Sequence, residues 1–138
     1  MEQVKINNDS VTHYFGMEDF ELSLKLAAII VKIIYVSEPP HGDSYHHLYI
    51  DDKKFPGYVW GCYFLFPFHQ KYMVCSWMKD LYDRKTVIID IKTSEYIILE
   101  KYYHHFKMIN HQIELMVTDE NEKLILDLSA VEKLFYVK

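Results

Sequence analysis

The sequence predicts a single α+β domain that is mostly β, with antiparallel sheets, sandwich-like or curved, and one or two short helices. Aromatic residues make up 16% of the 138 positions, and twelve of them are Tyr. Tyr and Phe favour strands over helix bundles. Short apolar or alternating runs recur between turn residues, as in antiparallel sheets. Only four Gly and four Pro occur, so no flexible linker divides residues 1–138.

Two segments in the first third of the chain can be interpreted in two ways. Residues 10–15 follow good helix-capping residues and precede Gly16, yet they include β-branched and aromatic side chains that suit a strand. Residues 20–26 alternate between apolar and polar, and residues 29–36 are almost continuously apolar. This pattern favours two strands within residues 18–36 and leaves one helix over the same range as the alternative.

The stretch from Gly57 to Tyr102 forms the predicted scaffold, because it holds both Trp and both Cys within apolar strands. Pro and Gly or charged clusters separate its strands from their neighbours. From residue 45 onward we expect strands at residues 45–50, 58–66, 70–77, 86–91, 95–99, 106–109, 112–118 and 123–128. Ser129 is placed to cap a final helical turn that reaches Phe135. The side chains expected in the core are Trp60, Cys62, Phe64, Cys75 and Trp77.

Composition excludes several classes of partner. The formal charge of −5 and the pI near 5.9 disfavour nucleic-acid binding, which needs clustered Lys and Arg. The longest apolar run, Leu26 to Val36, is shorter than the roughly twenty residues of a membrane span. The first ten residues lack the layout of a secretion signal. We therefore expect a cytoplasmic protein with no nucleic-acid or membrane partner.

Catalytic motifs are missing from the sequence. Nucleophile-elbow, zinc-protease and phosphate-loop patterns do not occur, and the cysteines do not form a CxxC pair. We therefore expect neither enzymatic activity nor a cofactor. The alternative is a small metal-dependent enzyme that uses the His41–His47 loop, where His41, Asp43 and His46 have the side chains of metal ligands. Because neighbouring residues of a strand face opposite ways, His46 and His47 are not expected to act together.

Acidic and tyrosine residues supply the candidate binding surface. Residues 112–132 carry six acidic residues against Lys123, and residues 9–21 carry a second acidic group. If these segments lie side by side, they form one negative face that suits a basic partner. Tyr side chains are common anchors at interfaces. The predicted binding residues are Glu114, Asp119, Glu120, Glu122, Asp80, Asp83, Asp90, Tyr102 and Tyr103.

Two segments, HYFGMEDFELSLKL (residues 13–26) and KYMVCSWMKDLYDRKTVIIDIKTSEYIIL (residues 71–99), resemble the small cytosolic immunity proteins of bacterial polymorphic-toxin systems. The resemblance covers under a third of the chain. It implies a single α+β or mostly-β domain that binds and neutralises a cognate toxin, and it assigns no functional residue. We expect a monomer that occludes a toxin's active site or basic groove. A self-associating structural β protein, joined through its sheet edges, is a further alternative.

Overall fold

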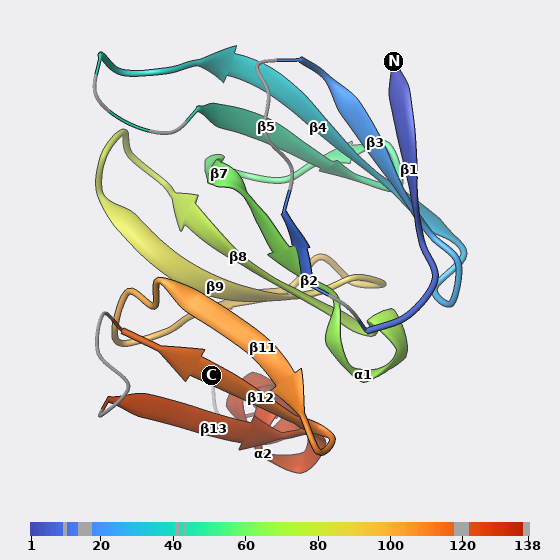
Figure 1. Cartoon of the computed structure of the whole chain (residues 1–138), viewed down its shortest axis with the longest axis vertical. Helices are drawn as coiled ribbons and strands as arrows, with labels where there is room; N and C mark the ends of the chain where they lie inside the picture. Colours follow the sequence, from blue (N-terminus) through green and yellow to red (C-terminus); the bar gives the residue numbers. More distant parts are fainter. Residues whose placement is uncertain (10, 14–17, 41, 43, 118–121, 137–138) are drawn as a thin grey trace.

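The computed structural model describes residues 1–9, 11–13, 18–40, 42, 44–117 and 122–136. Within these residues, ten strands form one sheet, three form a second sheet, and two short helices accompany them (Figure 1). Nearly all neighbouring strands are antiparallel; β1 and β3 run parallel. The predicted α+β, mostly-β fold is confirmed.

The larger sheet has the strand order β1-β3-β4-β5-β7-β8-β9-β10, with β2 beside β7 and β6 beside β5. Its strands are β1 (Glu2–Ile6), β2 (Val11–His13), β3 (Phe20–Leu24), β4 (Ile29–Ser37), β5 (Tyr45–Ile50), β6 (Lys53–Lys54), β7 (Tyr58–Leu65), β8 (Tyr72–Met78), β9 (Arg84–Asp90) and β10 (Tyr96–Ile98). The smaller sheet consists of β11 (His105–Ile109), β12 (Gln112–Met116) and β13 (Lys123–Asp127). The helices are α1 (Pro67–Gln70) and α2 (Leu128–Tyr136).

The larger sheet curls on itself, and its inner face encloses the first hydrophobic core (Figure 1). Ring contacts across the curl demonstrate this closure. Phe20 on β3 lies 6.5 Å from Phe64 on β7, although two strands separate β3 from β7 in the sheet. Phe55 similarly meets Tyr96 of β10 at 5.0 Å. The curl therefore buries both halves of one sheet against each other, as a sandwich would.

The smaller sheet and α2 pack on the outer face of β7, β8 and β9 and form a second core. Leu65, Val74 and Ile88 supply the outer face of the large sheet. Phe106, Leu115 and Val131 face them from the smaller sheet and α2. Every residue of β8 is buried, because this strand has one core on each side. That position explains why the central strands are apolar on both faces.

The ambiguous first third resolves into strands. β3 and β4 form an antiparallel hairpin, so the alternative of one helix over residues 18–36 is wrong. The alternating side chains place Phe20, Leu22 and Leu24 in the core. A turn containing Ala28 at φ +57° connects the two strands. The short helix considered for residues 10–15 lies partly outside the described residues, and the described part forms β2.

The expected core is largely confirmed. Trp60, Phe64, Cys75 and Trp77 are buried. Burial raises the pKa of the Cys75 thiol, which keeps it protonated and poorly reactive. Cys62 belongs to β7, and its side chain lies outside the described residues.

Candidate functional site

A pocket with aromatic walls and several carboxylates lies where β8 begins, β9 ends and α2 crosses (Figure 1 shows these elements). Its volume is about 360 Å³. We call it the acidic pocket; it is lined by Lys71, Tyr72, Asp90, Glu95, Glu132, Phe135 and Tyr136. Strand register brings Tyr72 and Asp90 together in the lining, because these two residues pair across β8 and β9. Helix periodicity brings Glu132, Phe135 and Tyr136 of α2 to the same pocket, because residues three and four apart share a helix face.

The aromatic wall of the acidic pocket is well ordered by contacts. The rings of Tyr72 and Phe135 stack with centroids 5.4 Å apart and an interplanar angle of 29°. Lys71 lies between charge and ring, with its Nζ 3.6 Å from Glu132 Oε1 and 5.5 Å from the Tyr72 ring centroid. Tyr136 is 85% exposed at the rim. The acidic pocket thus combines a buried ring, a partly exposed ion pair and an exposed ring.

Negative charge predominates in the acidic pocket. Three carboxylates and one ammonium line it, which gives −3 + 1 = −2. Burial raises the pKa of Tyr72, so this phenol remains neutral. Burial by itself would lower the pKa of Lys71, but Tyr72 and Glu132 outweigh it and leave that pKa above its ordinary value. Asp90 is held in place because its Oδ1 accepts hydrogen bonds from the backbone N–H groups of Lys92 and Thr93, at 3.0 and 3.2 Å.

The predicted binding residues do not gather at this pocket. Asp90 lines it, whereas Tyr103 and Glu122 meet at a separate cavity of about 230 Å³ that is also lined by Lys101, Val117 and Lys123. The Oε1 of Glu122 lies 3.5 Å from Nζ of Lys101, and Tyr103 is only 7% exposed. With two lysines and one acid, this second cavity is not negative. Asp119 and Glu120 lie outside the described residues.

The remaining predicted residues occupy other places. Asp80 and Asp83 belong to the turn between β8 and β9, at the opposite end of β9 from Asp90. Glu114 of β12 lies 3.2 Å from Lys123. The Tyr102 hydroxyl donates a hydrogen bond to Ser76 Oγ at 3.2 Å. The described residues are thus spread over several separate places on the molecule.

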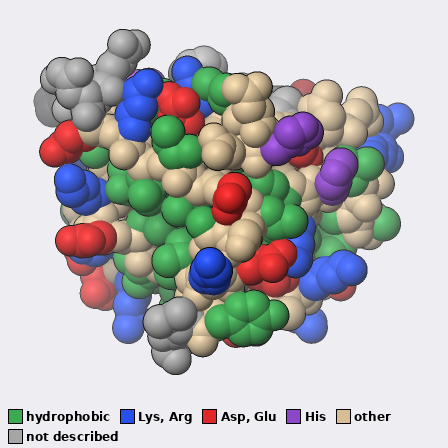
Figure 2. Space-filling view, turned by 90° about the horizontal axis from the view of Figure 1, so that it is seen from below, with side chains coloured by type: hydrophobic (Ala, Val, Ile, Leu, Met, Phe, Trp, Pro, Cys, Tyr) green, Lys and Arg blue, Asp and Glu red, His purple; other side chains and the backbone are tan. Residues whose placement is uncertain are grey.

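A single negative face uniting the first and last segments is not observed in the described part of the chain. β1 and β3 lie in the upper half of Figure 1, whereas β12, β13 and α2 lie at the bottom. Figure 2 shows acidic and basic side chains interspersed around an apolar centre on the face seen from below. Mixed charges of this kind give no uniform field. The acidic pocket is instead a local concentration of negative charge.

The histidine loop offers little to a metal ion in the described residues. His41 and Asp43 lie outside them, and His46 is fully buried against Phe20 and Tyr35, at centroid distances of 6.2 and 5.7 Å. Burial lowers the pKa of His46 to about 4. His47 faces the other side of β5 and stacks on Tyr58 at 5.1 Å, as its neighbouring position predicts. No group of three His, Cys, Asp or Glu suited to a metal occurs among the described residues.

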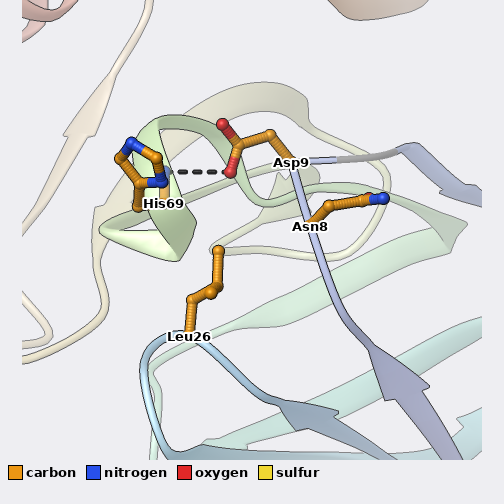
Figure 3. A pocket seen from close by; sticks show the side chains of 4 residues that line it. All are labelled: Asn8, Asp9, Leu26 and His69. Carbon is orange, nitrogen blue, oxygen red and sulfur yellow. Dashed lines mark hydrogen bonds between the residues drawn. The ribbon is translucent and has the colours of Figure 1, made fainter.

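A further cavity of about 370 Å³ lies beside α1 and is lined by Asn8, Asp9, Leu26 and His69 (Figure 3). The backbone here is strained, since Phe68, His69 and Gln70 have φ values of +56°, +56° and +63°. The Asp9 carboxylate accepts a hydrogen bond from the backbone N–H of His69 at 2.9 Å, drawn as the dashed line in Figure 3. The one carboxylate of this cavity therefore holds the left-handed turn in place, which favours a structural role.

No family model, curated protein or solved structure matches the chain. In the part of the chain that the structure describes, no helix has the length and apolarity to cross a membrane. Function must therefore be inferred from the surface itself. Of the cavities in the described part of the chain, the acidic pocket combines net negative charge with aromatic walls.

Sequence reasoning missed most of this pocket. Lys71, Tyr72, Glu95 and Phe135 carried no motif, and Glu132 and Tyr136 were visible only as members of an acidic, tyrosine-bearing segment. The one sequence signal that could have located part of the pocket was the pairing register of β8 and β9. Once β8 and β9 are paired through their short turn, Tyr72 must lie opposite Asp90. The crossing of α2 over that pair carries no comparable signal.

Proposed function

We propose that this chain is a non-enzymatic protein-binding domain, and most concretely an immunity protein that neutralises a cognate bacterial toxin in the cytoplasm. The acidic pocket is the observation that carries the proposal. Its volume lies at the low end of the roughly 300–1,000 Å³ typical of ligand pockets. That space suits one or two side chains of a partner better than an extended polymer.

The partner's basic side chain would enter between the carboxylates and the aromatic wall. The half-buried Phe135 ring, which stacks on buried Tyr72, offers apolar surface to the aliphatic stem, and a guanidinium or ammonium is attracted to aromatic faces. Glu132 and Glu95 lie at the same pocket and provide opposite charge. Exposed Tyr136 would then cover the bound group. Occlusion of a toxin's active site or basic groove follows if this basic side chain lies within or beside that groove.

Electrostatics would act mainly on the association rate. A net negative chain with a local acidic pocket attracts a basic partner, and salt screens this attraction. The aromatic contacts would slow dissociation. Association that slows steeply with ionic strength, with a nearly constant dissociation rate, is the expected signature.

The proposal can be tested by growth protection. The chain is co-expressed with the product of the toxin-like gene nearest to its own, and colony formation is counted. Wild type should protect; Glu132→Arg, which reverses charge in the pocket, and Tyr136→Ala, which removes the exposed ring, should protect poorly. Glu2→Arg is the matched control, because Glu2 is exposed on β1, away from α2. Urea unfolding must show that all variants fold.

Equal protection by Glu132→Arg and wild type would contradict a role for the acidic pocket. Absence of protection by wild type against that product, together with failure to capture any protein from the native cell, would contradict the immunity function itself.

A further inference from the structure

The smaller sheet covers only part of the outer face of the large sheet. At one end of β7, Tyr63 reaches the smaller sheet and donates a hydrogen bond to the Phe106 carbonyl at 2.8 Å. At the other end of β7, Tyr58 and Trp60 belong to a separate cluster. Gly61, at φ +68°, lies at the irregularity between the two halves of this strand. On the outer face of the large sheet, the half that carries Tyr58 and Trp60 is therefore packed by this separate cluster and not by the smaller sheet.

Three aromatic rings in this part of the outer face contact one another. Trp60 stacks on Tyr45 of β5, with centroids 6.4 Å apart and an interplanar angle of 8°. Tyr82 meets both rings edge-on, at 6.4 Å from Tyr45 and 6.3 Å from Trp60. Edge-to-face and stacked pairs at such distances are attractive. These three rings and Arg84 are named the aromatic patch below.

The turn between β8 and β9 folds back over the sheet to complete the aromatic patch. Tyr82 adopts φ +71°, a left-handed conformation that is costly for a bulky residue, and its N–H donates to Met78 Sδ at 3.1 Å. Tyr82 remains 55% exposed and the adjacent Leu81 44% exposed. Two apolar side chains are thus held at the surface by a strained turn. Such strain persists where the surrounding structure enforces it, and it often marks functional positions.

Arg84 is the only arginine of the chain. Its guanidinium carbon lies 4.4 Å from the centroid of the Trp60 ring, a cation–π contact. Asp83 is the adjacent acid, but its carboxylate lies 3.6 Å from Lys85 Nζ. Among the described residues, no carboxylate lies within 4.0 Å of the Arg84 guanidinium. A guanidinium that lies over a ring still directs its N–H donors outward in one plane, in the geometry that matches a carboxylate.

We propose that the aromatic patch is a docking site for a partner protein that presents a carboxylate next to an apolar side chain. The carboxylate would accept two hydrogen bonds from the edge of the Arg84 guanidinium. The apolar side chain would cover Tyr82 and Leu81. Tyr and Arg are among the residue types that dominate binding hot spots. Tyr82 and Arg84 are exposed here, and the buried Trp60 ring supports the Arg84 guanidinium.

Charge complementarity favours a single carboxylate over a polyanion. Arg84 is a single cation with no carboxylate within 4.0 Å among the described residues, whereas the chain as a whole carries −5 and Asp80 lies in the same turn. A nucleic-acid backbone would bring many phosphates against this net charge. One carboxylate set against one guanidinium needs no wider positive field.

The aromatic patch is independent of the acidic pocket. Arg84 and Asp90 mark the two ends of β9, which places them about 20 Å apart at the usual rise per residue. The acidic pocket would take a basic group and the aromatic patch an acidic one. Either surface can therefore fail its test without affecting the other.

The test uses the whole chain and two probe peptides, acetyl-Leu-Glu-Leu-amide and its matched acetyl-Leu-Gln-Leu-amide. The Arg84 Nε–H and Trp60 indole N–H signals are followed by NMR. The Glu peptide should shift both signals saturably and bind about tenfold more tightly than the Gln peptide, the usual worth of hydrogen bonds between charged groups. Arg84→Lys should lose most of this preference, because an ammonium lacks the planar fork. Lys85→Gln is the control and should keep it.

Four results would overturn the proposal. The first is equal binding of the Glu and Gln peptides, and the second is wild-type binding by Arg84→Lys. The third is displacement of the Glu peptide by an equal concentration of inorganic phosphate, which would make Arg84 a general anion site. The fourth is concentration-dependent dimerisation of the free chain that Arg84→Lys abolishes, which would assign the patch to a second copy.

Discussion

Replacing Gln70 with Leu should destabilise the protein strongly, because this fully buried side chain joins three separate segments. Its Oε1 accepts hydrogen bonds from the backbone N–H groups of Leu26 and Ala27, at 2.8 and 3.2 Å. Its Nε2 donates to the carbonyls of Ile6 at 2.7 Å and Asn8 at 3.4 Å. The side chain therefore connects α1 to the end of β1 and to the turn between β3 and β4.

The expected magnitude follows from the bonds that are lost. Leu is close to Gln in size and would have the same left-handed backbone conformation. The main difference between the two proteins is therefore the loss of the hydrogen bonds of the Gln70 amide. Each lost hydrogen bond costs about 1 kcal/mol, and a buried group left unpaired costs about 1–3 kcal/mol. The N–H groups of Leu26 and Ala27 are in partly buried contacts and can recover some hydration, whereas Gln70 and Ile6 are buried. The sum is about 3–5 kcal/mol in the free energy of unfolding.

Urea unfolding followed by tryptophan fluorescence measures this difference, since both Trp residues lie in the large sheet. Gln112→Leu is the matched control, because Gln112 is exposed on β12 and surface substitutions change stability by about 0.5 kcal/mol or less. A Gln70→Leu loss below about 1 kcal/mol would refute the reasoning, because it would mean that water or local rearrangement replaces all four bonds.

Two further predictions concern the fold. The pKa of His46 is about 4 in the folded protein and 6.5 when unconstrained, so the unfolded state binds more protons between these values and stability falls as pH drops. Between pH 6.5 and about pH 5 the loss should be about 1.6 kcal/mol by urea unfolding, and it should shrink in His46→Gln; equal pH profiles for the two proteins would contradict this. Gly57→Ala should cost more than about 1 kcal/mol, because Gly57 has φ +73° and a Cβ there would lie 2.4 Å from the Met78 carbonyl oxygen. Gly42→Ala, whose nearest contact would be 3.1 Å from a Pro39 side-chain atom, should cost less in the same measurement, and the reverse order would show that the clash is relieved cheaply.

Local sequence pattern determined most of the strands. The alternation from Phe20 to Leu24 buries every second side chain, and that period exists in the chain before any partner strand is present. The hairpin of β9 and β10 is equally local, because a short turn fixes its register. The continuous apolar run over residues 58–66 is likewise typical of an interior strand, and β7 lies between β5 and β8. These features depend on neighbours within a few residues, and so the sequence sufficed.

Contacts between segments that are distant in the chain could not be predicted from the sequence. The parallel pairing of β1 with β3 has no turn to signal it, since parallel strands need a long connection. The left-handed turn of α1 depends on Asp9 and on the buried Gln70 side chain, which bonds residues more than forty positions away. No local preference of Phe, His or Gln predicts positive φ there.

The binding surface shows the same division. Composition determined that the chain is acidic and rich in tyrosine, but it did not decide where those groups meet. Adjacent Tyr102 and Tyr103 separate, one bonding Ser76 and the other entering the second core, because neighbouring side chains project differently. Strand register then set Asp90 beside Tyr72, and the packing of α2 added Glu132. Proximity along the chain does not determine proximity in space, and so only the tertiary structure produced the acidic pocket.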